Sequence, residues 1–168
     1  YSFAVIPLFI LMGQFAFRSG LSSDLFNAAD KWLARFKGGL SMSTVAACAG
    51  FSAICGSTAA TAATMGVVAL PEMRKYGYKD GLATGSIAAG GTLGILIPPS
   101  TGFIIYGIIA EQSIGQLFAA GIIPGLILAL CYIVSIMIQV RINPDIAPGV
   151  QKYPLKEMLL ALRGTIGM

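Results

Sequence analysis

Long stretches without any charged residue dominate the chain. Four of them contain no Asp, Glu, Lys or Arg and cover residues 1–17, 38–71, 81–110 and 112–140. A helix that crosses a membrane needs roughly 20 apolar residues, because the hydrocarbon core is about 30 Å thick. Charged residues make up only 11% of the chain, against about 25% in soluble domains. The sequence therefore predicts an all-α polytopic membrane protein, in contact with membrane lipids.

The side-chain inventory excludes several classes of function. Basic residues gather in the short joints between apolar stretches, which is typical of cytoplasmic loops, so the net charge of +4 does not indicate a nucleic-acid partner. The chain has no histidine, which removes Ser–His and Cys–His catalysis and histidine metal sites. With no Asp, Glu or Lys at membrane depth, we expect no enzyme. Cys48, Cys55 and Cys131 lack metal-ligand spacing and are expected to be reduced packing residues.

The first half of the chain is predicted to form three elements. Residues 1–17 read as a transmembrane helix, and residues 21–36 as an amphipathic interfacial helix, because apolar and charged residues alternate there at helical spacing. Segment 38–73 is too long for one span and too short for two. Three basic residues precede it and three follow it, so the positive-inside rule places both of its ends on the cytoplasmic side. We predict a re-entrant helical hairpin.

The next segment, 81–110, is predicted to be a broken transmembrane helix. Its middle contains three glycines and the Pro98-Pro99 pair. Proline lacks a backbone donor and disfavours helix in the residue before it. We expect a helix to about Gly90, an extended stretch to Pro99, and a new helix from Ser100.

The rest of the chain continues this topology. Residues 117–140 are predicted to return as a transmembrane helix, 141–154 to form a cytoplasmic linker, and 155–168 to begin another helix. The charges place residues 18–37, 74–80 and the chain from 141 inside, and Glu111 outside. Since the chain begins within an apolar stretch, we expect it to be a fragment.

The hairpin tip and the helix break are the candidate site. A turn at bilayer depth leaves backbone groups unpaired, which is tolerated only where they are buried in protein or line a wet cavity. In secondary transporters, unwound carbonyls at such places coordinate Na⁺. The predicted sodium ligands are the hydroxyls of Ser57 and Thr58 and the carbonyls of Gly94, Ile97 and Pro99. Proton coupling normally uses an intramembrane carboxylate or histidine, and these stretches contain neither, so Na⁺ is the expected coupling ion.

An anionic substrate would meet no lysine or arginine in these two elements. It would have to be held by helix N-termini, amides and hydroxyls. The candidate substrate-binding residues are Gly56, Ser57, Gly91, Thr92 and Ser100. Close helix packing, which small residues also serve in membranes, is the alternative role for several of them.

Four segments resemble one family. Residues 6–13 (IPLFILMG), 56–62 (GSTAATA), 120–125 (AGIIPG) and above all 90–100 (GGTLGILIPPS) are similar to the large membrane (M) subunit of TRAP (tripartite ATP-independent periplasmic) transporters. The likeness covers nearly the whole chain.

The resemblance implies sodium-coupled uptake of an organic acid, such as a C4-dicarboxylate or a sialic-acid-like sugar, across the bacterial inner membrane by a multi-pass permease. It implies an elevator-type transporter built from inverted repeats, with a small membrane subunit and a periplasmic substrate-binding protein as partners. In that family one sodium lies between a hairpin tip and the unwound stretch, here Ser57 and Thr58 with Gly94, Ile97 and Pro99. The chain matches the first repeat, so the second half of the site is expected elsewhere.

Two other functions stay open at this stage. A sodium–anion symporter that works without a binding protein would share the hairpin architecture. An ion channel is the other alternative, because re-entrant segments also build selectivity filters.

Overall fold

The computed structural model describes residues 5–147, and this part of the chain is entirely helical apart from its loops. The predicted helix at 155–168 and the linker beyond residue 147 lie outside the described residues. The elements are α1 (Val5–Arg18), α2 (Leu21–Leu33), α3 (Gly39–Cys55), α4 (Thr58–Lys75), α5 (Asp80–Leu96), α6 (Thr101–Ile109), α7 (Ile114–Ile142) and a 3-10 turn, η2 (Pro144–Ile146).

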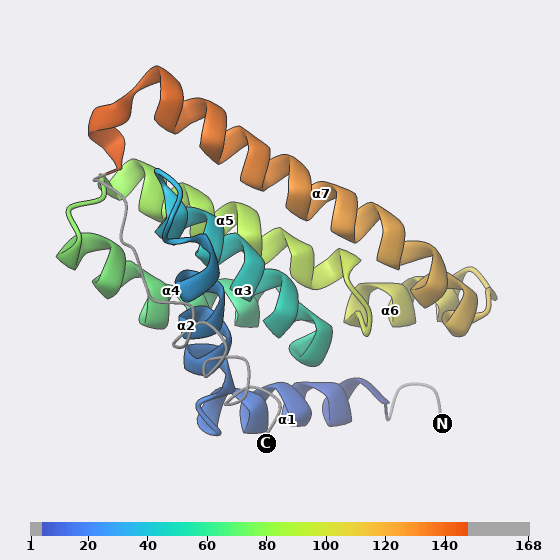
Figure 1. Cartoon of the computed structure of the whole chain (residues 1–168). Coiled ribbons are helices and arrows are strands. Elements are labelled where there is room, and N and C mark those ends of the chain that lie inside the picture. Colours follow the sequence, from blue (N-terminus) through green and yellow to red (C-terminus); the bar gives the residue numbers. More distant parts are fainter. Residues whose placement is uncertain (1–4, 148–168) are drawn as a thin grey trace.

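The helix α3 forms the centre of the molecule. It makes a hairpin with α4 over the segment predicted to be one, and α5 packs against both arms (Figure 1). Met42, Val45, Cys48 and Phe51 are all at most 1% exposed. A helix that is apolar all round needs neighbours on every side, and α3 finds them in α1, α2, α4, α5 and α7.

The helix α5 continues well past its predicted end. The expected stop at Gly90 and the extended stretch up to Pro99 are wrong, because α5 is helical as far as Leu96. A Cβ on Gly90 would lie 2.7 Å from Sγ of Cys48, and one on Gly91 would lie 2.8 Å from Cβ of Ala62. Each glycine costs a helix about 1 kcal/mol relative to alanine. Here that cost is offset by the close approach of α5 to the hairpin.

The break in this segment is therefore short. Only residues 97–100 leave the helix, and α6 departs from the axis of α5 by 41°. The helix α7 has 29 residues and extends the predicted span 117–140 at both ends. Within residues 5–147, α7 alone is long and apolar enough to cross a membrane, or two segments are if α5 with α6 counts as one bent span.

The amphipathic helix α2 has two different sides. It ends at Leu33 rather than at residue 36, and the chain then turns through to Gly38, where φ is +79°. Phe26 is buried on the side of α2 that packs on α3, whereas Trp32 is 40% exposed. One side of this helix therefore packs on another helix, and its predicted position in the membrane interface stays a prediction.

The cysteines divide into two environments. Cys48 and Cys55 are buried free thiols in the core around α3, as expected for packing residues. Cys131 is exposed on α7. The prediction that it packs inside the protein is wrong for the described part of the chain, because α7 presents that side outward.

The loops after α2, α4 and α7 meet at one end of the molecule (Figure 1, upper left). The hydroxyl of Tyr78 accepts a hydrogen bond from the N–H of Leu40 at 3.2 Å. The N–H of Lys79 donates to the carbonyl of Ile146 at 3.1 Å. The three loops that the charge pattern predicts to be cytoplasmic thus lie together, as one membrane face requires.

Replacing Tyr78 with phenylalanine is expected to destabilise this end by about 1 kcal/mol. Tyr78 is 9% exposed, and its hydroxyl satisfies an N–H at the start of α3 that has no partner within the helix. Burial raises the pKa of Tyr78 above its ordinary value, so the hydroxyl stays neutral. Thermal unfolding of the full-length permease measures the effect, with Tyr76→Phe in the same loop as control. Equal stability of the two variants would contradict this role.

Candidate ion and substrate site

The hairpin tip consists of two residues with different backbone conformations. Gly56 ends α3 in the left-handed region, with φ of +59°, and Ser57 is extended. A left-handed residue at the end of a helix is usually glycine. The hydroxyl of Ser57 accepts from the N–H of Ala60 at 3.4 Å and caps α4, whose first residue is Thr58. The tip thus brings the N-terminus of a half-helix and two hydroxyl residues to one point.

The tip is joined directly to the helix break. The N–H and the hydroxyl of Thr101 both donate to the carbonyl of Gly56, at 3.1 and 3.0 Å. The carbonyl oxygen of Pro99 lies so close to Gly56 that a Cβ on this residue would collide with it. Backbone from the hairpin and backbone from the break are therefore in contact.

Gly94 in α5 completes this meeting point. A Cβ on Gly94 would lie 2.7 Å from both C and O of Ser57. Residue 98 is proline and has no N–H, so the carbonyl of Gly94 lacks its usual partner four residues on. Pro99 has the same effect on Ile95, whose carbonyl instead accepts from the hydroxyl of Ser100 at 2.6 Å. An oxygen without its intrahelical partner is thus left beside the tip.

Most of the predicted site residues come together here. Gly56 and Pro99 touch, and Gly94 lies against the peptide that joins Ser57 to Thr58. Gly91 is one turn further back, where its Cβ would lie 3.4 Å from the carbonyl oxygen of Thr58.

Three predicted residues have other surroundings. The side chain of Ile97 packs on α7, where a Cβ of Gly125 would lie 2.8 Å from its Cγ1, while the ligand role of its main-chain carbonyl stays a prediction. The hydroxyl of Thr92 lies 3.0 Å from that of Tyr132 on α7, so the structure does not bring it to the tip. Ser100 is fully buried, and its hydroxyl is engaged in capping α6.

Sequence reasoning missed Thr101 and two glycines of α7. Gly121 and Gly125 fit against the break, since a Cβ on Gly121 would lie 2.7 Å from the carbonyl oxygen of Leu96. Their spacing of four residues puts them on one face of α7, which is a known signal for close packing of membrane helices. Thr101 carried no such signal, because its role depends on where the tip lies.

The electrostatics of the site come from helix ends. No Asp, Glu, Lys or Arg occurs in segments 38–71 and 81–110. The N-termini of α4 and α6, capped by Ser57 and Ser100, carry partial positive charge, and the C-termini of α3 and α5 carry partial negative charge. Such an arrangement can hold a small cation and an anionic group side by side.

Replacing Thr101 with valine is expected to weaken the junction between tip and break by about 1 kcal/mol. Valine keeps the β-branched shape and removes the hydroxyl that donates to the carbonyl of Gly56. Thermal unfolding of the full-length permease measures the loss. The control is Thr84→Val, whose hydroxyl donates only within its own helix, to the carbonyl of Asp80. A loss no larger than that of the control would rule out a clamping role for Thr101.

Within residues 5–147 a helical hairpin and a broken helix meet at their interruptions, an arrangement typical of the class of membrane transporters with discontinuous helices. The particular family is shown by sequence comparison. The model of the family described as "Tripartite ATP-independent periplasmic transporter, DctM component" matches residues 1–164, and the chain belongs to this family.

Several relatives that are similar to this chain in sequence have different named substrates. The C4-dicarboxylate TRAP transporter large permease protein of Pseudomonas aeruginosa is 37% identical over 163 residues, which cover 97% of this chain and 38% of the relative. The ectoine large permease protein of Halomonas elongata is 40% identical over 137 residues, 82% of this chain and 32% of the relative. The isethionate permease protein of Oleidesulfovibrio alaskensis is 43% identical over 125 residues, 74% of this chain and 20% of the relative.

The chain thus spans between 20% and 38% of the length of these curated relatives. It corresponds to part of a TRAP transporter large permease, which is a transporter subunit and not an enzyme.

Proposed function

We propose that the permease containing this chain takes up an organic acid across the bacterial inner membrane, driven by Na⁺. The observation that carries the proposal is the contact of Gly94 with the peptide between Ser57 and Thr58, beside a carbonyl that Pro98 leaves without its intrahelical partner. Both interrupted elements of this chain contribute to that one point.

The chemistry of the site favours sodium over protons. Hard cations are bound by oxygen ligands, and here these are the hydroxyls of Ser57 and Thr58 and the carbonyls of Gly94, Ile97 and Pro99. A proton-coupled site would call for a carboxylate or a histidine at membrane depth, which segments 38–71 and 81–110 lack. Sodium enters here as transported cargo rather than as a fixed cofactor.

The family supports the proposals for the substrate and the partners. A C4-dicarboxylate permease is among the relatives, and the N-termini of α4 and α6 can receive an acidic group near Gly56, Ser57 and Gly91. We therefore propose an organic acid as substrate, with the inverted second repeat supplying the rest of its pocket. The name of the family, tripartite and periplasmic, supports a small membrane subunit and a periplasmic binding protein as partners.

The packing of α5 suits an elevator-type movement. Gly90, Gly91 and Gly94 bring α5 against both arms of the hairpin, with approaches that leave no room for a methyl group. Close-packed elements move as one body rather than deforming. In this proposal the hairpin and the broken helix carry the site together.

Transport by the reconstituted system tests the proposal. The full-length permease, its small subunit and its binding protein are placed in liposomes, and uptake of labelled organic acids is measured with Na⁺ or choline outside. We expect uptake only with both Na⁺ and the binding protein. Unchanged uptake in choline would refute sodium coupling, and conductance without the binding protein would indicate a channel instead.

The double variant Ser57→Ala with Thr58→Ala tests the site itself. If each hydroxyl contributes about 1 kcal/mol, the Na⁺ concentration for half-maximal uptake should rise at least about tenfold. Thr84→Ala with Ser113→Ala removes two hydroxyls remote from the tip and serves as control. An unchanged sodium dependence in the first variant would show that the tip does not bind the ion.

A further inference from the structure

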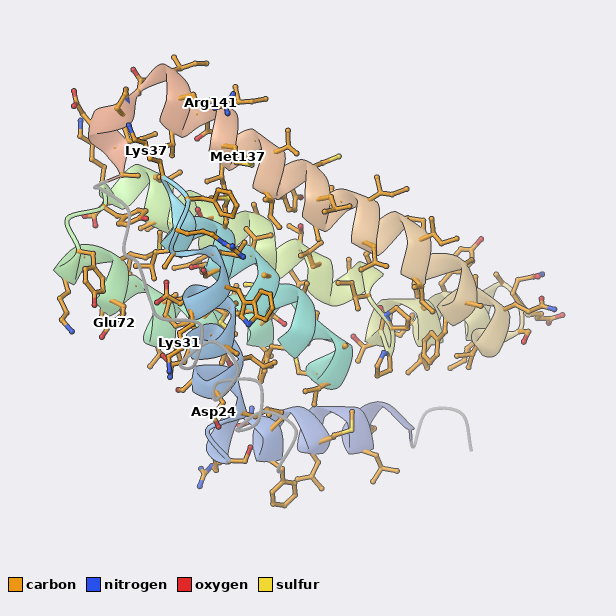
Figure 2. All side chains as sticks on the ribbon, in the orientation of Figure 1. Asp24, Lys31, Lys37, Glu72, Met137 and Arg141 are labelled. Atoms are coloured by element: carbon orange, nitrogen blue, oxygen red, sulfur yellow. The ribbon has the colours of Figure 1, made fainter. Side chains whose placement is uncertain are left out.

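A small pocket lined by two basic side chains lies at the end of the molecule opposite the hairpin tip. Its volume is about 210 Å³, and it is lined by Phe36, Lys37, Met137, Val140 and Arg141. Figure 2 shows Lys37, Met137 and Arg141 close together, where the loop after α2 meets the last turns of α7.

Tight backbone packing places Lys37 and Arg141 near each other. A Cβ on Gly38 would lie 2.8 Å from Cγ2 of Val140, so the loop is pressed onto α7 at this point. Lys37 precedes Gly38 and Arg141 follows Val140. Their nearness is therefore built into the fold, although like charges repel. An anion between them would relieve that repulsion.

No acidic side chain of residues 5–147, including Asp145 four residues after Arg141, forms an ion pair with Lys37 or Arg141. The side chains of Lys37 and Arg141 form no hydrogen bond with another residue in the range 5–147. The lining of the pocket contains no acidic residue. Asp24 and Glu72 lie well away from it in Figure 2.

A separate apolar groove lies on α7, nearer its N-terminus than this pocket. It has a volume of about 420 Å³ and is lined mainly by apolar residues, among them Ile127, Leu130, Val134 and Ile138. Arg141 follows Val134 and Ile138 by seven and three residues, so all three share one face of the helix. From 127 to 138 the helix rises about 17 Å, close to half of the roughly 30 Å hydrocarbon core.

We propose that this pocket binds the phosphate headgroup of an anionic phospholipid of the cytoplasmic leaflet, whose acyl chain lies in the α7 groove. Basic pockets between membrane helices on the cytoplasmic side suit such headgroups. A free phosphate would match the two cations but would leave the apolar wall of Phe36 and Met137 unused. The inference rests on the cytoplasmic placement of this end and is independent of sodium coupling.

Lipid binding to the full-length permease tests the proposal directly. Phosphatidylglycerol, phosphatidylcholine and inorganic phosphate are each titrated onto delipidated protein, with binding followed by native mass spectrometry and thermal shift. Phosphatidylglycerol should bind and stabilise, and the other two should not. Each basic residue near the headgroup is worth about fivefold in affinity, so Lys37→Gln with Arg141→Gln should weaken binding about 25-fold.

A matched variant separates a site from general charge attraction. Lys75→Gln with Lys79→Gln removes the same charge from exposed residues at the end of α4 and just before α5 and should leave the affinity unchanged. Equal losses in both double variants, no preference for phosphatidylglycerol, or full stabilisation by phosphate would each overturn the lipid site. If the double variant does not fold, the single variants Lys37→Gln and Arg141→Gln are measured, with about fivefold expected for each.

Discussion

Replacing Gly94 with alanine is expected to reduce sodium-dependent uptake by about 100-fold or more. The added Cβ would lie 2.7 Å from C and O of Ser57 and 2.8 Å from N of Thr58. These are backbone atoms, so no rotamer change can relieve the contact, and α5 must separate from the hairpin tip. Displacements near 1 Å in a binding constellation can cost about 100-fold in rate. Uptake by the reconstituted transporter measures the effect.

The control for this variant is Gly85→Ala on the same helix. A Cβ there meets nothing within 4 Å, and alanine favours the helix by about 1 kcal/mol relative to glycine. Gly85→Ala should therefore transport normally with equal or higher stability. Normal uptake by Gly94→Ala would show that the tip and α5 need not approach so closely.

Replacing Gly56 with alanine is expected to destabilise the permease by about 2–5 kcal/mol. A left-handed backbone costs an L-residue roughly 1–2 kcal/mol, and φ of Gly56 is +59°. In addition, the new Cβ would collide with the carbonyl oxygen of Pro99, and overpacking costs about 1–3 kcal/mol. Thermal unfolding of the full-length protein reports the sum, and uptake should fall with it.

Gly20→Ala separates these two contributions. Gly20 also has a positive φ, +83°, but a Cβ there meets nothing within 4 Å. This control should lose only the conformational part, about 1–2 kcal/mol, and keep its transport activity. Similar losses in the two variants would mean that contact with Pro99 contributes nothing.

Local chemistry predicted the order of elements well. The uncharged stretch between two groups of basic residues indicated the hairpin, and helices α3 and α4 form it over segment 38–73. The Pro98-Pro99 pair indicated a break because proline cannot donate a backbone hydrogen bond, and α5 ends at Leu96. Both signals act within a few residues, so one sequence suffices to read them.

The glycines of α5 misled the prediction for a physical reason. In isolation these glycines weaken a helix, so the local prediction ends the helix at about Gly90 and makes Gly91 and Gly94 extended. In the structure their missing side chains let α5 approach the hairpin closely. Packing against a distant segment outweighed local propensity, and nothing in neighbouring residues reports that.

The sequence by itself determined that the chain is helical, that its long apolar segments suit a membrane, and that oxygen atoms near Ser57 and Gly94 are the chemistry available to an ion. Only the tertiary structure decided which of those residues meet. It brought Gly56 to Pro99 and clamped the pair with Thr101, but it turned Thr92 toward Tyr132 and buried Ser100 in a helix cap. Composition and hydrogen-bonding capacity belong to single residues, whereas a contact 45 residues apart, as between Gly56 and Thr101, exists only once the helices have packed.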